Sequence, residues 1–520
     1  MKNCPHNTKR ILPFLGFSVI AGLISALWGT AFKLGAEWVI HLSSAAYGAV
    51  QQAPIWIPLL LIGAAVLGLG ASILVSRAQS CKGGGIPTAV AAVRGIVDFP
   101  WLQSVLILPF SALITFLSGL PLGTEGPCVQ MGTAVGDGVT QCLGGKKHRV
   151  WRRYIMTGGA AAGFSIATAS PITAIVFSLE ELHKKFSPLL LAGVSVAVMT
   201  AQIAAQLLAA FGIGSTHLFH ALEIGPLPAS KMLVPVLIGI VCGLCSVLFT
   251  TLYHKVEAVV RKILGKLSIK VLFPILFAGI CMVGLCLSDA LSTGHSLVDK
   301  LFHPGTAWYL LILVFLLRAV FMMVTNTAGV TGGAFLPTLA FGAIVGALCA
   351  EAMVALGMLE QQQYLLAVVL GVTAFLGATS RIPITACVFA VEALSGFSNT
   401  LPIVIAATIA YLIAELSGVE DFTDAVIEAK ERSLHKDKKP ETFDYTLTVG
   451  KDSFLDGRKL CDILWPNACA VISVEHAHAG HHGEHLQAED KVTLRYQTYD
   501  SAATAEELNA LADEQSPINI

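Results

Sequence analysis

Long apolar segments constrain this chain more than any other feature, because a helix of about 20 apolar residues crosses the hydrocarbon core of a bilayer. Such segments lie near residues 11–40, 55–76, 102–120, 188–212, 232–253, 271–290, 308–325, 339–357 and 401–417. With 55% hydrophobic and only 13% charged residues, the composition excludes an ordinary soluble globular protein. We therefore expect an all-α polytopic membrane protein embedded in a lipid bilayer.

Charged residues indicate how the chain is oriented. Basic residues gather near 146–153, at Lys184 and Lys185, and between Lys255 and Lys270, whereas the segments near 213–229 and 291–306 hold few. The excess of basic residues marks the cytoplasmic side. We expect a protein of a bacterial-type cytoplasmic (inner) membrane with both termini in the cytoplasm. The overall balance of 33 basic and 34 acidic residues gives no field that would attract nucleic acid.

The apolar region contains an internal duplication. Residues 171–182 read PITAIVFSLEEL and residues 383–394 read PITACVFAVEAL, with eight of twelve positions identical at an offset of 212. GTEGP at 123–127 and GAFLP at 333–337 agree in their first glycine and their proline at an offset of 210. The repeats span about 11–212 and 230–417. Paired broken helices are typical of transporters whose site lies between two repeats, and periodicity alone leaves open whether the repeats are inverted.

Three glycine and proline elements each open a short helix: GGGIP at 83–87, GTEGP at 123–127 and GAFLP at 333–337. Glycine exposes backbone N–H groups and a helix N-terminus carries partial positive charge, so these elements suit an anion. Any one of them could instead be a breaker that allows close helix packing. Three together, two of them repeated, favour an anion site.

Two glutamates are candidates for proton transfer. Glu125 lies inside the second element, where its ionised form could occupy an anion site and its protonation would release it. The alternative is a glutamate stabilised only by the helix dipole. Glu180 and Glu392 occupy equivalent positions of the repeats and are interpreted as structural. Glu181 aligns with Ala393 and therefore has no acidic counterpart. Glu181 is therefore either a proton relay or an interfacial glutamate neutralised by nearby lysines.

These elements, together with FSLEEL at 177–182, resemble the CLC family of chloride channels and proton-coupled anion antiporters over roughly residues 10–432. The resemblance implies a CLC-type inverted repeat with broken helices and a homodimer with one anion pathway in each subunit. It also implies that Glu125 is the external gate and proton acceptor and that Glu181 is the internal proton relay. Family channels usually lack the second carboxylate, so we expect a proton-coupled antiporter, with chloride as the default anion. A passive chloride channel, or an antiporter for fluoride or nitrate, is the alternative.

The resemblance also places an anion site, with two departures. The family's central serine is replaced by Gly84, and the position of its central tyrosine is best matched by Thr423, next to Phe422. Thr124 replaces a common basic residue near the external entrance. The anion-binding residues expected from the motifs are Gly84, Gly85, Ile86, Gly126, Phe335, Leu336 and Thr423.

The charged C-terminal part differs from the apolar body. We expect a transport domain at 1–432, a linker at 433–444 and a small α+β domain at 445–520, with strands near 445–449, 468–474 and 492–496 and helices near 457–464 and 504–511. GRKLCDIL and AEDKVTLRY resemble the C-terminal regulatory domain of potassium-transport regulators, the TrkA-C type, which implies a regulatory module that could bind a small-molecule ligand.

A histidine-rich loop lies between two of the expected strands. It could bind a transition metal, but a solvated loop is the favoured interpretation of its histidines, which are His476, His478, His481, His482 and His485. No metalloprotease motif, complete P-loop or nucleophile elbow occurs in the chain. We therefore expect neither an enzyme nor a cofactor.

Overall fold

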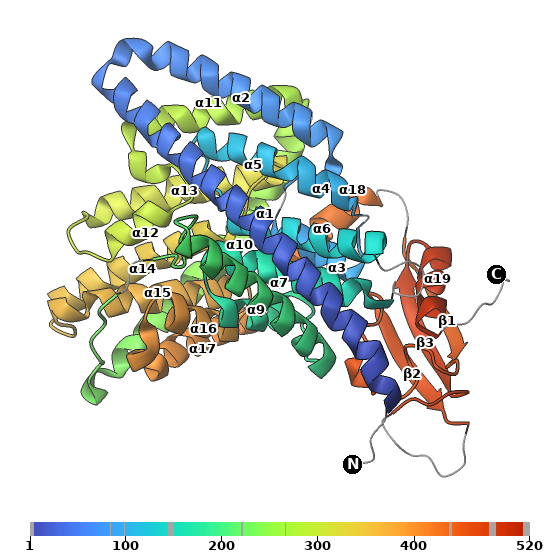
Figure 1. Ribbon diagram of the computed structural model, residues 1–520. Helices are drawn as coiled ribbons and strands as arrows, with labels where there is room; N and C mark the ends of the chain where they lie inside the picture. Colours follow the sequence, from blue (N-terminus) through green and yellow to red (C-terminus); the bar gives the residue numbers. More distant parts are fainter. Residues whose placement is uncertain are drawn as a thin grey trace.

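The protein consists of a helical membrane body with a small mixed domain at one end (Figure 1). The computed structural model describes residues 5–83, 85–97, 99–143, 150–219, 222–265, 267–435, 439–477 and 485–512. The first half of the body comprises α1 (Pro5–Gln52), α2 (Ile57–Arg77), α3 (Ile86–Arg94), α4 (Trp101–Leu106), α5 (Leu108–Leu117), α6 (Glu125–Leu143), α7 (Arg152–Thr168), α8 (Pro171–Phe177), which continues as a π-helical turn (Ser178–Leu182), and α9 (Pro188–Ala210).

The second half repeats the pattern of long and short helices. It comprises α10 (Leu233–Leu264), α11 (Ile269–Cys286), α12 (His295–Leu301), α13 (Trp308–Ala328), α14 (Phe335–Ala355), α15 (Tyr364–Thr379), α16 (Pro383–Ala393), α17 (Thr400–Leu416) and α18 (Phe422–Leu434). Within the described residues, nine helical segments are long and apolar enough to cross a membrane. The prediction of a polytopic helical protein is confirmed.

Two spans differ from the sequence prediction. The segment predicted at 102–120 is divided at Ile107 into α4 and α5, because Pro109 in the first turn of α5 has no N–H to continue the helical hydrogen bonds. The span α15 was not predicted, since its apolar run of 16 residues is shorter than a typical membrane-crossing helix and follows the polar segment Gln361–Gln363. This helix is 83% buried inside the body, so it is shielded from lipid by its neighbours.

The two repeats are inverted, as the family resemblance implied and as periodicity alone left open. Gly123 and Gly333, from equivalent elements, form an antiparallel pair in which each N–H donates to the other carbonyl, at 2.7 and 2.8 Å. The equivalent helices α8 and α16 also run in opposite directions. Each begins where the other ends, and this arrangement shows that equivalent helices of the two repeats point to opposite sides of the membrane.

Glu180 and Glu392 hold this antiparallel arrangement together. The Glu180 carboxylate accepts the N–H groups of Ile384 and Thr385 at 3.0 and 2.7 Å. The Glu392 carboxylate accepts those of Ile172 and Thr173 at 2.9 and 2.8 Å. Each carboxylate thus satisfies the free first-turn N–H groups of the other repeat's helix, and the structural interpretation of these two glutamates is confirmed.

Glycines allow the central helices to approach closely in both repeats. A Cβ atom on Gly132 of α6 would lie 2.1 Å from the Gly159 carbonyl oxygen of α7. The equivalent Gly342 of α14 would meet the Gly371 carbonyl oxygen of α15 at 2.8 Å. Such backbone contact between helices is typical of membrane proteins. It makes the centre of the body a rigid support for the motifs that begin α6 and α14.

The small domain after the body is a three-stranded antiparallel sheet with one helix. Its strands are β1 (Glu441–Thr448), β2 (Cys469–Glu475) and β3 (Lys491–Thr498) in the order β1-β3-β2, followed by α19 (Ser501–Ala512). The helix predicted near 457–464 is wrong: the segment contains only a short 3-10 turn at Leu460–Asp462. Instead of forming a helix, its backbone groups bond to the membrane body.

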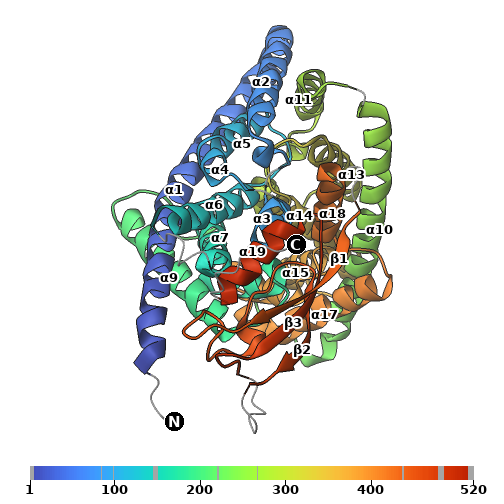
Figure 2. The same ribbon diagram turned by 90° about the vertical axis from the view of Figure 1, so that its right-hand side faces the viewer.

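The small domain docks against the body beside the start of α7. The Tyr154 hydroxyl donates to the Asp462 carbonyl at 2.7 Å and accepts the Leu464 N–H at 3.1 Å. Trp151 stacks on Phe14 of α1 and meets Phe454 of the small domain edge to face. The domain and the adjoining end of α1 therefore lie on the same side of the body (Figures 1 and 2).

Candidate functional site

The three glycine and proline elements meet at one point in the body. A Cβ atom on Gly126 would lie 2.6 Å from the Cα of Gly333 and 2.9 Å from the Cα of Gly85. No side chain fits between these backbones, which explains the glycines. The contact brings the first turns of α3, α6 and α14 together, so that the free N–H groups of three helix starts surround one region.

An inner cavity lies on one side of this meeting point. Its volume is about 20 Å³, enough for one water-sized species. Ile86 and Phe335, the first residues of α3 and α14, line it together with Glu181 and Thr423. Two further hydroxyl residues, Thr338 and Ser380, lie in its wall. The cavity therefore combines helix N-termini and hydroxyl groups with one carboxylate.

The residues expected to bind the anion are distributed unevenly. Ile86, Phe335 and Thr423 line the inner cavity, whereas Leu336 lines a second, outer cavity. Gly126 contributes the close backbone contact described above. Gly85 donates its N–H to Gln130 Oε1 at 2.8 Å, so this donor is already occupied. Gly84 lies outside the described residues.

Glu181 is buried at the inner cavity, at the end of the π-helical turn that follows α8. Its carboxylate accepts a hydrogen bond from the Thr423 hydroxyl, and its Oε2 has no partner within the described residues. Thr423 thus joins the cavity to Glu181. A carboxylate with one open oxygen beside a small polar cavity can exchange a proton with that cavity.

A charged cluster surrounds Glu181 on the side away from the cavity. Arg94 donates to the backbone carbonyl of Glu181 at 2.9 Å and pairs with Asp424 at 3.3 Å. Lys184 pairs with Asp421 and Asp424 at 2.9 and 2.6 Å. Burial raises the pKa of Asp424, but Lys184 and Arg94 outweigh burial and lower it below its usual range. The ion pairs fix α18, and with it Thr423, against the turn that carries Glu181.

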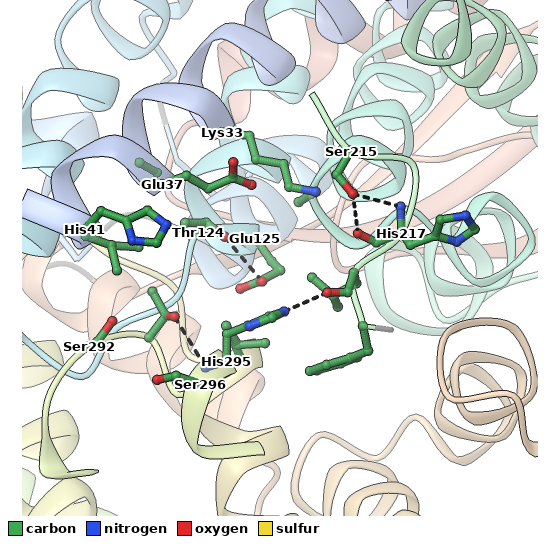
Figure 3. Close-up of a pocket in the computed structure, with 17 residues that line it drawn as sticks. Lys33, Glu37, His41, Thr124, Glu125, Ser215, His217, Ser292, His295 and Ser296 are labelled. Atoms are coloured by element: carbon green, nitrogen blue, oxygen red, sulfur yellow. Dashed lines mark hydrogen bonds between the residues drawn. The ribbon is translucent and has the colours of Figure 1, made fainter. Parts of the chain in front are cut away.

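Glu125 faces an outer cavity of about 670 Å³ on the other side of the meeting point. Figure 3 shows its carboxylate in the middle of this cavity, below Lys33 and Glu37 of α1 and beside His295. The side chain is fully buried and folds back over Gly123, where an added Cβ would lie 2.5 Å from its Oε2. Glu125 therefore stands between the outer cavity and the meeting point of the helices.

The Glu125 carboxylate is held weakly. Its Oε1 accepts one hydrogen bond from Thr124 at 3.3 Å, and its Oε2 has no partner among the residues described. Thr124, which replaces a basic residue, thus serves as a donor to the glutamate. A carboxylate with so few fixed partners can leave its position without breaking a strong network.

Two cationic residues of the outer cavity were missed in the sequence. Lys33 comes from the middle of α1, and His295 begins α12. The ring of His295 meets two acceptors, the Leu218 carbonyl at Nε2 (2.6 Å) and the Asp299 carboxylate at Nδ1 (3.2 Å). Burial lowers the pKa of His295, but these acceptors outweigh burial and raise it. Neither residue lies in a motif, and their segments are far apart in the chain, so sequence patterns alone did not indicate that they share a cavity.

The described histidines of the histidine-rich loop have partners within the protein. His476 Nδ1 lies 3.0 Å from Asp490, and His485 Nδ1 lies 3.1 Å from the Gly457 carbonyl. Within the described residues, no group of three or more histidine, cysteine or acidic side chains is placed to hold a metal. His478, His481 and His482 lie outside the described residues.

Sequence comparisons identify related transporters. The family model described as voltage gated chloride channel matches residues 67–415. The H(+)/Cl(-) exchange transporter ClcA of Yersinia pseudotuberculosis serotype IB (strain PB1/+) is 27% identical over 432 residues, covering 81% of this chain and 88% of the relative. The protein of the same name from Klebsiella pneumoniae (strain 342) is 26% identical over 428 residues, covering 81% and 89%.

Solved structures share the fold. A slow cyanobacterial Cl-/H+ antiporter superimposes with a TM-score of 0.74 at 21% identity, covering 83% of this chain and 99% of the other. A CLC-type fluoride/proton antiporter gives a TM-score of 0.64 at 20% identity, covering 80% and 98%. At these identities the similarity concerns the fold alone.

Proposed function

Because the chain belongs to the voltage-gated chloride channel family, we propose that it exchanges chloride for protons across a cytoplasmic membrane. One observation carries this proposal. Two buried carboxylates, Glu125 and Glu181, each with an oxygen that has no partner within the described residues, lie in separate cavities on opposite sides of the meeting point of α3, α6 and α14. Passive conduction would need neither an inner proton relay nor its burial.

Glu125 acts as the outer gate and proton acceptor. Its ionised carboxylate occupies the position that an anion would take near the starts of α6 and α14, where the helix dipoles favour negative charge. Protonation removes that charge, and the side chain then yields the position to chloride. The single weak hydrogen bond from Thr124 is consistent with such movement.

Glu181 passes protons between the cytoplasm and the inner cavity. The hydrogen bond from Thr423 and the position of Glu181 in the cavity wall support this role. The anion in that cavity would be held by the first-turn N–H groups of Ile86 and Phe335 and by nearby hydroxyls. Ser380 and Thr338 are candidate replacements for the serine that is absent at Gly84.

Purified protein in liposomes tests the proposal. With a chloride gradient imposed, chloride efflux and external pH are recorded together for the wild type, Glu125→Gln and Glu181→Ala. We expect chloride to drive protons uphill in the wild type and proton movement to be lost in both variants, with chloride flux retained in Glu181→Ala. Glu420→Ala, which removes an exposed acidic side chain near the same face but outside the cavity, is the matched control.

The alternatives give distinct results in the same assay. Chloride flux without proton movement in the wild type would identify a passive channel. Normal proton pumping by Glu181→Ala would refute the proposed inner relay. Replacing chloride with fluoride or nitrate decides which anion is transported, since Gly84 and Thr423 alter both side chains that the family usually places at the central anion.

We also propose that two chains form a homodimer through α8, α9, α16 and α17. These helices adjoin one another, and the equivalent residues Ile172 and Ile384 are 58% and 61% exposed. Inverted symmetry would bring both to one apolar face. Ile384→Trp should shift the detergent-solubilised protein toward monomer in light scattering, whereas Ile62→Trp on α2, which is similarly exposed at 62%, should not.

The region after residue 432 is proposed as a cytoplasmic regulatory module, with a linker at 433–444 and a TrkA-C-like domain at 445–520 that could bind a small molecule. Its contacts with Tyr154 and with Lys185, which follows Glu181 closely in the chain, support regulation of the inner side. This domain and the adjoining end of α1 lie on the same side of the body, which agrees with a cytoplasmic position of both termini. Protease accessibility in inside-out and right-side-out vesicles tests that orientation.

A further inference from the structure

The outer cavity contains a lysine that the proposed exchange does not use. Lys33 lines this cavity, and its Nζ is buried without a hydrogen-bond partner among the described residues. A buried ammonium without a hydrogen-bond partner is unfavourable. The Glu125 carboxylate interacts with this ammonium electrostatically, but no described residue forms a hydrogen bond with it, so the ammonium can also bind an anion from the cavity.

The surroundings of Lys33 favour a small anion. Figure 3 shows the Lys33 side chain reaching across the cavity above Glu125, with His295 on the opposite side. Both Lys33 and His295 lie close enough to Glu125 to interact with it electrostatically. Because its two ring nitrogens face acceptors, His295 must donate from both and carries a positive charge.

Neighbouring residues leave space for the anion. Apart from Glu125, the only acidic residue in the wall of the cavity is Glu37, among the residues described. The cavity of about 670 Å³ also reaches Leu336 in the first turn of α14. Lys33 and the positive ends of α6 and α14 thus face a space much larger than the Glu125 carboxylate, together with His295, whose charge is partly balanced by Asp299.

We propose that Lys33 anchors an outer binding site for a small inorganic monovalent anion, one step outside Glu125. The inference rests on the proposed exchange in taking the bound anion to be the transported one. Lys33 then supplies from α1 the positive charge that Thr124 no longer supplies from the GTEGP element. The anion bound there can replace the Glu125 carboxylate at the helix starts.

Chloride binding by the full-length, detergent-solubilised protein tests the site without requiring transport. The readout is the rise in apparent melting temperature with chloride concentration, which reports binding to the folded state. For Lys33→Met we expect the chloride concentration that gives half of the rise to increase about tenfold, since a full charge close to the anion is removed. Lys33→Arg should restore most of the affinity.

Lys231→Met is the matched control, because Lys231 pairs with Glu360 outside the cavity. Its chloride dependence should equal that of the wild type. If Lys33 had only a structural role, Lys33→Met would lower the melting temperature measured in the absence of chloride and would leave its dependence on chloride unchanged. This result would overturn the proposal. An equal response of Lys33→Met and the wild type would overturn it as well.

Liposome flux separates this inference from the proposed function. If the wild type exchanges chloride for protons, Lys33→Met should require about tenfold more external chloride for half of its maximal rate. If the wild type moves no protons, the proposed antiport fails, but a chloride-dependent melting temperature that Lys33→Met weakens would still establish the anion site.

Discussion

Thr423 is the residue that links the two halves of the proposed exchange. Its hydroxyl donates to Glu181, and its side chain lines the cavity at the starts of α3 and α14. The sequence identified Thr423 only as a poor match to a tyrosine, and its contact with Glu181 could not be read from spacing. Asp421 and Asp424 hold it in place through Lys184.

Thr423→Val should uncouple protons from chloride. The substitution keeps the shape and removes one hydrogen bond to a carboxylate, a contribution of about 1.5–3 kcal/mol. We expect chloride-driven proton movement to slow roughly tenfold, since about 1.4 kcal/mol corresponds to a factor of ten. The measurement is the ratio of proton to chloride flux in liposomes.

Thr338→Val is the comparison, because the Thr338 hydroxyl lines the same cavity but already donates to the Ala334 carbonyl at 2.8 Å. A smaller change in the flux ratio is expected from it. Equal changes in both variants would show that the cavity responds to lost polarity in general and not to the contact with Glu181.

Asp490 makes the stability of the small domain depend on pH in the acidic range. Its carboxylate accepts the N–H groups of Ala477 and Gln487 at 3.0 and 2.8 Å. Burial raises its pKa, but these hydrogen bonds outweigh burial and lower the pKa below its ordinary value. The carboxylate therefore stabilises the fold above its unfolded pKa of about 4, and this contribution is lost as pH falls through the lower folded value.

Asp490→Asn should accelerate proteolysis of the small domain in the full-length protein at pH 7, through a loss of about 2 kcal/mol. The difference from the wild type should shrink below about pH 4, where an acid-active protease such as pepsin provides the readout. A difference that stays constant from pH 7 to pH 3 would contradict this assignment of the carboxylate.

At the scale of elements, α8 and α16 depend on each other. Each is only a few turns long, and each has its first N–H groups satisfied by a glutamate at the end of its partner. The repeat PITA…E was visible in the sequence, and it identified Glu180 and Glu392 as equivalent. The reciprocal contact itself required the antiparallel arrangement, which periodicity does not encode.

Glu180→Gln and Glu392→Gln should therefore destabilise the protein to a similar degree. An amide has a single acceptor oxygen for two backbone donors, and we expect a loss of about 1–3 kcal/mol for each variant. Apparent melting temperatures in detergent provide the measurement. A large loss in one variant and none in the other would contradict the symmetric role.

The contact between the small domain and α7 is also an element-scale feature. Tyr154→Phe would leave the Leu464 N–H without its partner and remove one of two donors to the Asp462 carbonyl, at a cost of about 1–3 kcal/mol. We expect faster cleavage by protease at the linker near residues 436–440 of the full-length protein. Tyr309→Phe, on an exposed side chain of α13, should leave the cleavage rate unchanged.

At the scale of the whole molecule, composition and repetition were sufficient to predict a duplicated, polytopic helical body. The glycine and proline elements also predicted which segments would meet, because close backbone contact tolerates no side chain at Gly85, Gly126 or Gly333. The span α15 was missed because its apolar run of 16 residues is shorter than a typical membrane-crossing helix. Lys33 and His295 were missed because segments far apart in the chain form the outer cavity.

The voltage at which net chloride flux stops tests coupled exchange most directly. Protein in liposomes is studied with fixed chloride gradients, the voltage is set with potassium and valinomycin, and the zero-flux voltage is found with and without a pH gradient. Coupled exchange predicts that the pH gradient shifts this voltage in the wild type and that Glu181→Ala abolishes the shift. A zero-flux voltage in the wild type that follows the chloride gradient alone would contradict the account.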